Sequence, residues 1–280
     1  MTHRKLPSTK VAGLFYNSAV KLFVFDVDGT LINDDEPTPE LIAAVNERLQ
    51  KGDAIAIASG RPYSGIKPYL DYFQEGQKFS LGANGVIVQK EDGTTLKDFG
   101  MSPTEFLDFY HRHLKEVENG IHIYCYTEKE LGCFEISSSV EWELACNFMV
   151  HRDLNNWPLT KNDKILKFML SSTKEKIDSF PILEEDKKYQ ILRSAPNYLE
   201  FVRADADKAS GVEFLRNYLK IEKEDVYCFG DQGNDVGMIR NYQGVAMGNA
   251  TEECKKAAKF ITKPVWENGV AFALKTFVNN

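Results

Sequence analysis

Two aspartates that follow a run of apolar residues are the first candidates for chemistry in this sequence. Asp26 and Asp28 come directly after Leu22–Phe25, and Gly29 then turns the chain away. On an extended backbone, side chains two residues apart point to the same side, so the two carboxylates lie together. Like charges this close repel each other unless a cation neutralises them or one carboxyl group holds a proton. The pair therefore indicates a divalent metal site or a general acid–base role, and a solvated aspartate-rich turn is the alternative without function.

The residues around this pair predict a strand–helix–strand unit. The apolar run before Asp26 predicts a strand buried on both faces, 38–50 predicts a helix, and 53–59 (D-A-I-A-I-A-S) predicts a second buried strand. Strands joined in this way are parallel neighbours. Ser59 and Gly60 should then lie beside Asp26, at the edge of the sheet where open α/β proteins bind their ligands.

A second group of charged residues lies far along the chain and repeats this arrangement. Residues 226–230 predict another buried strand, and Asp231 and Asp235 follow it across a turn that enters a helix. A simple Asx turn at the helix entry is the alternative. Lys208 falls in the first turn of another predicted helix, where a cation opposes the helix dipole. Because this placement is unfavourable for structure alone, it suggests a function for Lys208, such as neutralising the Asp26 carboxylate and an anionic ligand, for example a phosphate.

These segments resemble the motifs of the haloacid dehalogenase (HAD) superfamily. The sequence D-V-D-G-T-L at 26–31 matches motif I of that family at every position, and Ser59-Gly60-Arg61 is similar to motif II. Lys208 is the only lysine near the place of motif III, and G-D-Q-G-N-D at 230–235 closely resembles motif IV of the type IIB phosphatases. Segments of the group called Cof-like hydrolases are matched in the same order by G-V-A-M-G-N-A at 244–250 and N-G-V-A at 268–271.

The resemblance implies a role for each of these side chains. Asp26 is expected to attack phosphorus and form an aspartyl-phosphate, and Asp28 to act as general acid and base. A carboxylate suits the first role because it is already ionised at neutral pH. Mg²⁺ is the implied cofactor, and the implied metal-binding residues are Asp26, Asp28, Asp231 and Asp235. The implied phosphoryl-binding residues are Ser59, Gly60, Asn234 and Lys208.

Arg61 and Asn84 each allow two interpretations. Arg61 is a candidate for a second contact to the phosphoryl group, or the partner of a surface acid. Asn84 lies in the segment A-N-G-V, which only partly matches the N-G-A segment that type IIB members often have at the entry to their cap domain. Asn84 therefore lines the cleft, or it simply forms an Asn-Gly turn.

An inserted domain must separate the two halves of the predicted site. The 149 residues from Ser59 to Lys208 (208 − 59) are far more than one strand–helix connection needs. The fold class that we expect is α/β, a Rossmann-like parallel-sheet core with helices on both faces plus an inserted α+β cap of type IIB. The expected boundaries are an N-terminal extension at 1–18, a core made of 19–85 and 196–280, and a cap at 86–195.

The predicted cap contains no motif of its own. Helices are expected at 103–118, 139–150 and 173–185, and strands at 121–127, 131–137, 164–170, 189–193 and 198–203. Four aromatic residues there, Tyr124, Tyr126, Trp142 and Trp157, either stack on a sugar or pack within the cap. The cap histidines are not expected to bind a metal.

Composition limits the kinds of partner. The net charge of −7 argues against nucleic acid, and it requires a locally positive site for an anionic substrate. No apolar stretch approaches the length of a membrane span, and the first residues lack the apolar core of a signal peptide. Five cysteines without C-x-x-C pairs are typical of reduced thiols in a cytoplasmic protein.

The expected function is a Mg²⁺-dependent phosphatase of small phosphorylated metabolites, sugar phosphates first among them, working as a monomer or weak homodimer. A phosphosugar mutase with the same fold is one alternative. A sugar-phosphate sensor without catalysis is another, although all four motifs are intact in this chain. The sequence does not name the substrate, because in this family the cap selects it.

Overall fold

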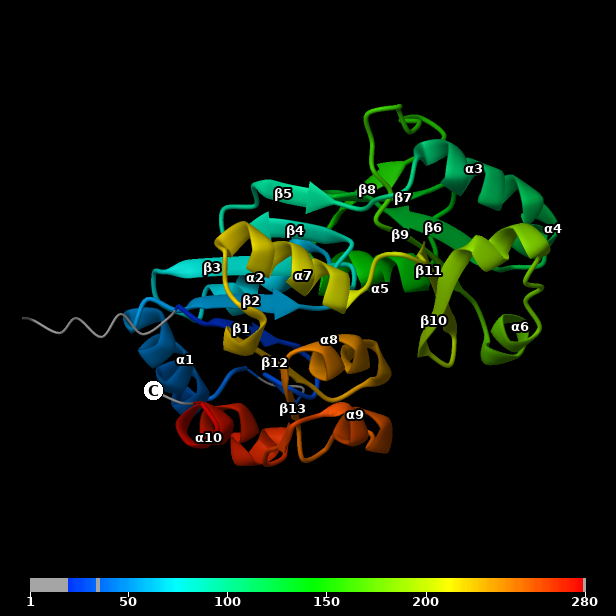
Figure 1. The fold of residues 1–280 in the computed structure, drawn as a ribbon. Coiled ribbons are helices and arrows are strands. Elements are labelled where there is room, and N and C mark those ends of the chain that lie inside the picture. The colour runs from blue at the N-terminus through cyan, green and yellow to red at the C-terminus, as the bar shows by residue number, and fades with distance from the viewer. Residues whose placement is uncertain (1–19, 34–35, 279–280) are drawn as a thin grey trace, which may run out of the picture.

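The computed structural model describes residues 20–33 and 36–278, so the expected extension at 1–18 lies outside the described residues. Two sheets organise the described chain, and each packs its own hydrophobic core. Figure 1 shows the larger sheet with helices on both of its faces, and the smaller sheet beside it in green.

The larger sheet has eight strands in the order β14-β13-β12-β1-β2-β3-β4-β5. All neighbours from β14 to β3 are parallel, while β4 and β5 are antiparallel additions. Its strands are β1 (Leu22–Phe25), β2 (Ala54–Ala58), β3 (Gln77–Gly82), β4 (Ile87–Lys90), β5 (Thr95–Asp98), β12 (Val226–Gly230), β13 (Gln243–Ala246) and β14 (Phe260–Ile261). The predicted Rossmann-like core is confirmed.

The central position of β1 follows from its sequence. All four residues of β1 are buried, as an apolar run without alternation requires of a strand covered on both faces. The Phe23 ring stacks on Tyr227, and Phe25 packs on Phe229, so β1 and β12 are also held together by aromatic pairs. Both strands consequently end at the same edge of the sheet.

Six helices cover this sheet: α1 (Pro39–Gln50), α2 (Tyr63–Leu70), α7 (Lys208–Leu219), α8 (Val236–Asn241), α9 (Glu252–Ala257) and α10 (Gly269–Thr276). Thr38 caps α1, since its hydroxyl accepts a hydrogen bond from the N–H of Leu41, and Pro39 is the first helical residue. Asp207 caps α7 in the same way through the N–H of Ser210. This cap fixes where α7 begins, and so where Lys208 stands.

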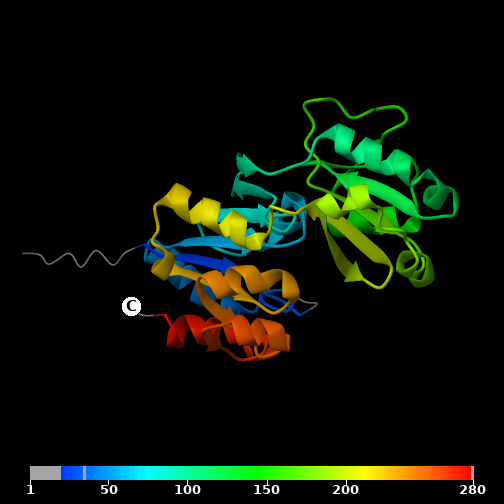
Figure 2. The same ribbon diagram turned by 45° about the vertical axis from the view of Figure 1, so that its right-hand side comes forward.

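The smaller sheet has six strands in the order β10-β11-β9-β6-β7-β8. Its strands are β6 (His122–Tyr126), β7 (Glu130–Cys133), β8 (Val150–Asp153), β9 (Lys167–Ser171), β10 (Tyr189–Ala195) and β11 (Tyr198–Arg203). Its helices are α3 (Pro103–Arg112), α4 (Leu114–Glu118), α5 (Ser138–Cys146) and α6 (Lys174–Asp178). Short 3₁₀ helices lie at Glu184–Lys188, Lys223–Asp225, Gly233–Asp235 and Val265–Glu267. Figure 2 shows this second unit projecting from the carboxyl-end side of the larger sheet.

All three helices expected in the inserted part are shorter than predicted, and the one expected over 139–150 ends at Cys146, before β8 begins at Val150. The helix expected over 103–118 is broken at His113, whose buried ring bonds the Asp186 carboxylate at 2.8 Å. The helix expected over 173–185 ends at Asp178, shortly before Pro181, because a proline disfavours helical geometry in the residue before it. Strands β4, β5 and β8 and helix α2 were not predicted.

The chain passes between the two sheets at places other than the expected boundaries. Strands β4 and β5 belong to the larger sheet although they follow residue 85, and β11 belongs to the smaller sheet although it follows residue 195. We propose that the inserted unit spans about 100–204, with the core on either side of it.

The turn that joins β3 to β4 has an unusual backbone and a tight environment. Ala83, Asn84 and Gly85 all have positive φ, of 49°, 58° and 87°. A Cβ atom on Gly85 would overlap the carbonyl oxygen of Asp207 and lie 3.0 Å from the Cα atom of Lys208. The start of α7 can pack on this turn only because residue 85 has no side chain.

We therefore expect Gly85→Ala to lower the free energy of unfolding by about 3 kcal/mol or more, from left-handed strain plus overlap with α7. Gly52→Ala is the matched control, because Gly52 has φ of 86° with no atom within 4 Å of the added Cβ. It should cost only the left-handed strain, about 1–2 kcal/mol. Urea denaturation measures both variants, and equal losses would refute the close approach.

Candidate active site

The charged residues predicted from sequence meet at the carboxyl edge of the larger sheet. Asp26 follows β1 and Asp231 follows β12, the parallel neighbour of β1. Lys208, the first residue of α7, is fully buried between them. Its Nζ atom lies 2.6 Å from Oδ1 of Asp26 and 2.6 Å from Oδ1 of Asp235. Segments 182 and 27 residues away from Lys208 are thus joined by one ammonium group.

The balance of charge in this cluster is negative. Burial raises the pKa of Asp26 to about 8, although Lys208 opposes the shift and Asp235 adds to it. Burial also raises the pKa of Asp231 to about 6, with Asp235 as the second cause. Burial alone would lower the pKa of Lys208, but the carboxylates of Asp235 and Asp26 outweigh it and raise that pKa. One ammonium group does not neutralise three carboxylates, so the cluster favours a further cation.

The cluster fits a small divalent cation. Among residues 20–33 and 36–278, one group of acidic side chains offers ligand atoms within 4.8 Å of one another, namely Asp26, Asp231 and Asp235. All three donors are carboxylate oxygens, the kind that Mg²⁺ prefers. A Cβ atom on Gly29, where φ is 85°, would overlap the Asp231 carboxylate. The Asp231 carboxylate can therefore lie against this turn only because residue 29 has no side chain.

Asp235 is held by the protein on both of its oxygens. Oδ1 accepts from Lys208, and Oδ2 accepts the backbone N–H groups of Asp231 at 2.9 Å and Gln232 at 3.0 Å. The Asp231 carboxylate accepts hydrogen bonds from two side chains, from the Thr30 hydroxyl at 3.3 Å and from the Gln232 amide at 2.9 Å. Asp235 is therefore suited to orient the loop and Lys208, whereas Asp26 and Asp231 are better placed to bind a cation directly.

Asp28 lies in a different environment from Asp26. Its carboxylate accepts two hydrogen bonds from the Arg61 guanidinium, at 2.9 Å and 3.2 Å, and more than half of its side-chain surface is exposed. Of the two interpretations of Arg61, the structure agrees with the pairing to an acid. That acid is Asp28, the candidate acid–base residue itself. The Asp28 carboxylate does not join the cluster of three, and the resemblance implies a metal contact through the Asp28 backbone carbonyl.

The remaining predicted residues lie together next to this edge. Ser59 follows β2 and is buried, and the Arg61 N–H donates to its hydroxyl oxygen at 3.3 Å. The Asn234 amide donates to the Asn84 side-chain oxygen at 3.0 Å, and the Asn84 N–H donates to the Ser59 carbonyl at 2.8 Å. A Cβ atom on Gly60 would lie 3.4 Å from the Asn84 amide. Asn84 therefore forms its turn and also lies beside the candidate phosphoryl site.

A cavity of about 300 Å³ lies between this edge and the second unit. Most of the residues that line it were not predicted from the sequence. The core contributes Asp28, Ser59, Gly60 and Arg61, and the second unit contributes Trp142, Glu143, Asn147, Lys167, Tyr198 and Glu200, among others. A signal was present, because Lys167 and Glu200 are charged residues flanked on both sides by apolar residues within predicted strands. Such charges point to a partner or a ligand at that place.

The four aromatic residues considered for sugar stacking differ in whether they line this cavity. Tyr124 and Tyr126 are buried and pack within the unit, whereas Trp142 lines the cavity, with its ring 6.5 Å from that of Tyr198. Trp157 is exposed and is not among the residues that line this cavity. No histidine belongs to a possible metal cluster within the described residues.

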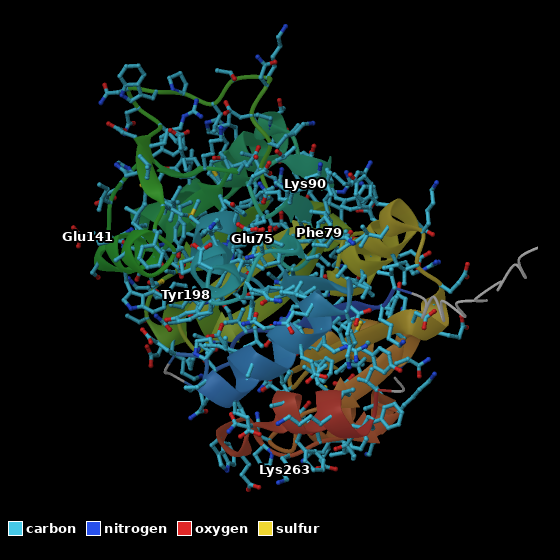
Figure 3. All side chains as sticks on the ribbon, turned by 90° about the vertical axis from the view of Figure 1, so that its left-hand side faces the viewer. Glu75, Phe79, Lys90, Glu141, Tyr198 and Lys263 are labelled. Carbon is cyan, nitrogen blue, oxygen red and sulfur yellow. The ribbon has the colours of Figure 1, made fainter. Side chains whose placement is uncertain are left out.

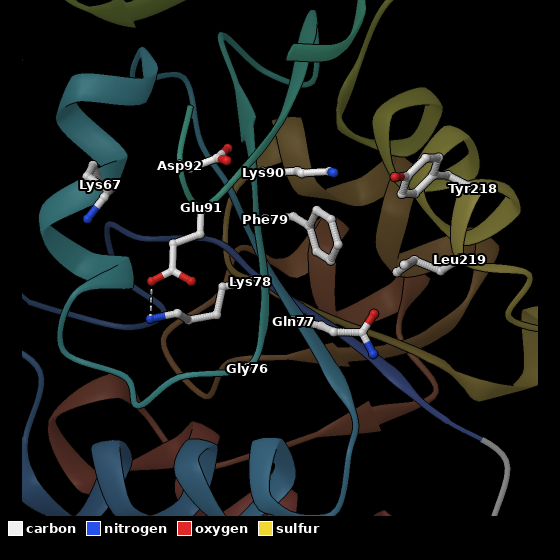
Figure 4. A pocket seen from close by; sticks show the side chains of 10 residues that line it. All are labelled: Lys67, Gly76, Gln77, Lys78, Phe79, Lys90, Glu91, Asp92, Tyr218 and Leu219. Atoms are coloured by element: carbon white, nitrogen blue, oxygen red, sulfur yellow. Dashed lines mark ion pairs between the residues drawn. The ribbon is translucent and has the colours of Figure 1, made fainter. Parts of the chain in front are cut away.

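A second cavity, of about 640 Å³, lies where β3 begins and β4 ends (Figure 4). The residues that line it include Lys67, Gln77, Lys78, Phe79, Lys90 and Tyr218. Lys78 is ion-paired with Glu91, the contact drawn as a dashed line. In Figure 3, Phe79 and Lys90 lie apart from Tyr198, which lines the first cavity. None of the predicted site residues lines this second cavity.

Comparison with known proteins defines the class of this chain. The sequence profile described as haloacid dehalogenase-like hydrolase matches residues 23–274, and the chain therefore belongs to that family. The Bacillus subtilis protein named "Putative phosphatase YxeH" is 32% identical over 273 residues, which cover 92% of this chain and 98% of the relative.

Solved structures agree with this class. A haloacid dehalogenase-like hydrolase from Bacteroides thetaiotaomicron superposes with a TM-score of 0.81 at 28% identity, covering 92% of this chain and all of that chain. The structure titled as the HAD subclass IIB sugar phosphatase BT4131 shares the fold, with a TM-score of 0.73 at 23% identity over 92% and 99% of the two chains. The predicted family, fold class and assignment to the phosphatase enzymes are confirmed. Within the described residues no helix is both long and apolar enough to cross a membrane.

We expect Mg²⁺ to stabilise the protein more at high pH than at low pH. The pKa values of about 8 for Asp26 and about 6 for Asp231 lie above their unfolded value of 3.8, so the metal-free folded chain retains protons that the unfolded chain has released. Its stability should then fall as pH rises through this window, and the cation must displace those protons at low pH. At about 100 times its dissociation constant, Mg²⁺ would add about 2.7 kcal/mol.

The measurement is the thermal unfolding midpoint with and without MgCl₂, at about pH 5 and about pH 8.5. Asp231→Asn is the control and should lose the Mg²⁺-dependent increase at the higher pH. An equal Mg²⁺ effect at both pH values, or an undiminished effect in Asp231→Asn, would contradict the site.

Proposed function

We propose that this protein is a Mg²⁺-dependent phosphatase that hydrolyses small phosphomonoesters, sugar phosphates in particular, through an aspartyl-phosphate on Asp26. The observation that carries the proposal is the Lys208 ammonium group, which contacts both Asp26 and Asp235 at 2.6 Å beside Asp231. A buried lysine in this position fixes a carboxylate nucleophile next to a cation site. The family membership and the phosphatase name of a relative 32% identical to this chain support the same chemistry.

Each proposed residue has one task in the first half-reaction. One oxygen of Asp26 attacks phosphorus in line with the leaving oxygen, while Lys208 holds Oδ1 of the same carboxylate. Asp28 gives its proton to the leaving oxygen as the bond from phosphorus to that oxygen breaks. Ser59 and the N–H of Gly60 donate hydrogen bonds to the phosphoryl oxygens. The Asp26 and Asp231 carboxylates would hold Mg²⁺, which would supply Lewis-acid stabilisation of the negative charge.

The second half-reaction uses the same groups in reverse. Asp28, now ionised, takes a proton from water, and the water oxygen attacks phosphorus. The bond between phosphorus and Asp26 breaks, and inorganic phosphate leaves. Arg61 holds the ionised Asp28 carboxylate of the second half through two hydrogen bonds, and one of these gives way when Asp28 carries the proton of the first half. In this proposal Asn234 contacts the phosphoryl group. Its amide donates a hydrogen bond to the side chain of Asn84, which lies beside Gly60 and so keeps Asn234 near the phosphoryl-binding loop.

The cavity next to Asp28 supports a small, uncharged and hydroxylated leaving group. Its volume of about 300 Å³ is at the small end of the range for ligand pockets. Four of its charged residues are paired within the protein, Arg61 with Asp28 and Lys167 with Glu200, and Glu143 accepts hydrogen bonds from Tyr126 and Asn147. Polar acceptors on Glu143 and the exposed ring of Trp142 suit the hydroxyl groups and the C–H face of a sugar.

The surroundings of the site support two further parts of this proposal. All proposed site residues come from one chain, which is compatible with activity as a monomer or a weak homodimer. The cysteines at 125, 133, 146, 228 and 254 are free, as expected for a protein of a reducing compartment such as the cytoplasm.

We expect Asp26→Asn to lower kcat at least about 10⁴-fold, because the amide cannot attack phosphorus. Asp28→Asn should also lose turnover but still slowly form the aspartyl-phosphate, which mass spectrometry of the Asp26 peptide would detect. Phosphate release from a panel of phosphorylated metabolites, with Mg²⁺ or EDTA, is the assay. Asp71→Asn, on the surface in an ion pair with Lys67, is the control and should leave activity unchanged.

Release that persists in Asp26→Asn or in EDTA would refute this mechanism. Turnover that depends on a bisphosphate activator would indicate a mutase instead. A folded wild-type protein that binds sugar phosphates without hydrolysing any would indicate a sensor.

A further inference from the structure

Lys167 makes a direct contact between the inserted unit and the candidate phosphoryl-binding loop. It is the first residue of β9, and its side chain is almost fully buried. Its Nζ atom donates to the backbone carbonyl of Gly60 at 3.1 Å and to Oε2 of Glu200 at 3.0 Å, and it lies 4.7 Å from the centre of the Tyr126 ring. The ammonium group therefore has one anchor within the inserted unit and one on the core.

The hydrogen bond from Lys167 to the Gly60 carbonyl influences the position of Ser59 through one rigid peptide group. The carbonyl of Gly60 and the N–H of Arg61 belong to the same planar peptide group, so fixing one fixes the other. That N–H donates to Oγ of Ser59 at 3.3 Å. Because the hydroxyl oxygen accepts there, its own O–H is left to donate elsewhere, and the phosphoryl group is the acceptor that the proposed reaction would bring.

The neighbouring contacts show that this loop lies at a formed interface. The Ser64 hydroxyl donates to the Asn147 carbonyl at 2.6 Å, and a Cβ atom on Gly65 would lie 3.0 Å from the Asn147 side chain. Those contacts join α5 to α2 beyond the loop. Lys167 acts on the loop itself, and a buried ammonium group must keep its hydrogen-bond acceptors because leaving it unpaired is costly.

We propose that Lys167 is a positioning residue that holds the Gly60–Arg61 peptide group, and so orients the Ser59 hydroxyl toward the phosphoryl group when the inserted unit lies against the core. This inference rests on the proposed phosphatase function. It makes the inserted unit part of the phosphoryl site, in addition to enclosing the leaving group. Lys167 acts through Gly60 and needs no contact with the substrate.

The test compares Lys167→Met, Glu200→Gln and the double variant Lys167→Met/Glu200→Gln with the wild type. The double variant removes both charges of the buried pair, so it avoids an unpaired Glu200 carboxylate that would itself destabilise the fold. Lys164→Met is the matched control, because it removes the same charge three residues earlier at an exposed position. Thermal unfolding establishes that each variant is folded.

Two measurements distinguish positioning from other roles. The first is kcat and KM for two substrates with unlike leaving groups, p-nitrophenyl phosphate and a hexose 6-phosphate. The second is the affinity for inorganic phosphate in Mg²⁺ buffer, by calorimetry. We expect Lys167→Met and the double variant to lower kcat about 10- to 100-fold by the same factor for both substrates, and to weaken phosphate binding. Glu200→Gln should have a smaller effect, and Lys164→Met none.

Several outcomes would overturn the proposal. Unchanged kinetics and unchanged phosphate affinity in the folded double variant would leave Lys167 with a structural role. A change confined to KM for one substrate, with phosphate affinity intact, would make Lys167 a contact for the leaving group. If the wild type hydrolyses neither substrate, the proposed function fails separately, and phosphate affinity alone decides the role of Lys167.

Discussion

The buried Lys208 ammonium group is the constraint on which the rest of the structure depends. A charge at this depth costs several kcal/mol unless acceptors surround it, and the chain provides them from the ends of two neighbouring strands. Asp26 and Asp235 must therefore meet at one place, although the whole inserted unit separates Asp26 from the lysine. The requirement explains why α7 begins against the turn at Gly85, where no side chain would fit. A misplaced α7 would leave the Lys208 cation buried without these acceptors and the Asp26 carboxylate without the Lys208 donor.

The same edge of the sheet holds two aspartates in contrasting environments. Asp26 is enclosed by the sheet, Lys208 and the neighbouring carboxylates, whereas Asp28 faces the cleft and is paired with Arg61. The first environment restrains a carboxylate, and the second leaves one accessible to the leaving group and to water. The inserted unit completes the cleft with side chains from α5, β9 and β11. In the proposed mechanism, attack and proton transfer would thus occur on opposite sides of one phosphoryl group.

Most of the core and its charged cluster could be predicted, because local patterns determine both. An unbroken apolar run requires a strand covered on both faces, and a strand–helix–strand connection places the strand ends together. The inserted unit was harder to predict, since contacts with residues far along the chain decide where its helices end. The helix that ends at His113 is an example, because the His113 ring bonds Asp186. The contact of Lys167 with Gly60 depends on how the inserted unit lies against the core, and that of Arg61 with Asp28 depends on how side chains meet after two neighbouring core strands. No spacing along the chain encodes such contacts, although a charge within an apolar strand marks where to look.

The turn at Ala83–Val86 has a consequence for how such enzymes diversify. It contacts the start of α7 through Gly85, and the Val86 carbonyl accepts the N–H of Phe99 at 2.7 Å. Both crossings of the chain between the units therefore lie near one anchored point of the core. Substitutions, insertions or deletions in the second unit that leave Lys167 in place can remodel the leaving-group side of the cleft while the anchored crossings keep the phosphoryl chemistry in place. Changes in substrate choice and retention of the reaction then depend on largely different segments of one chain.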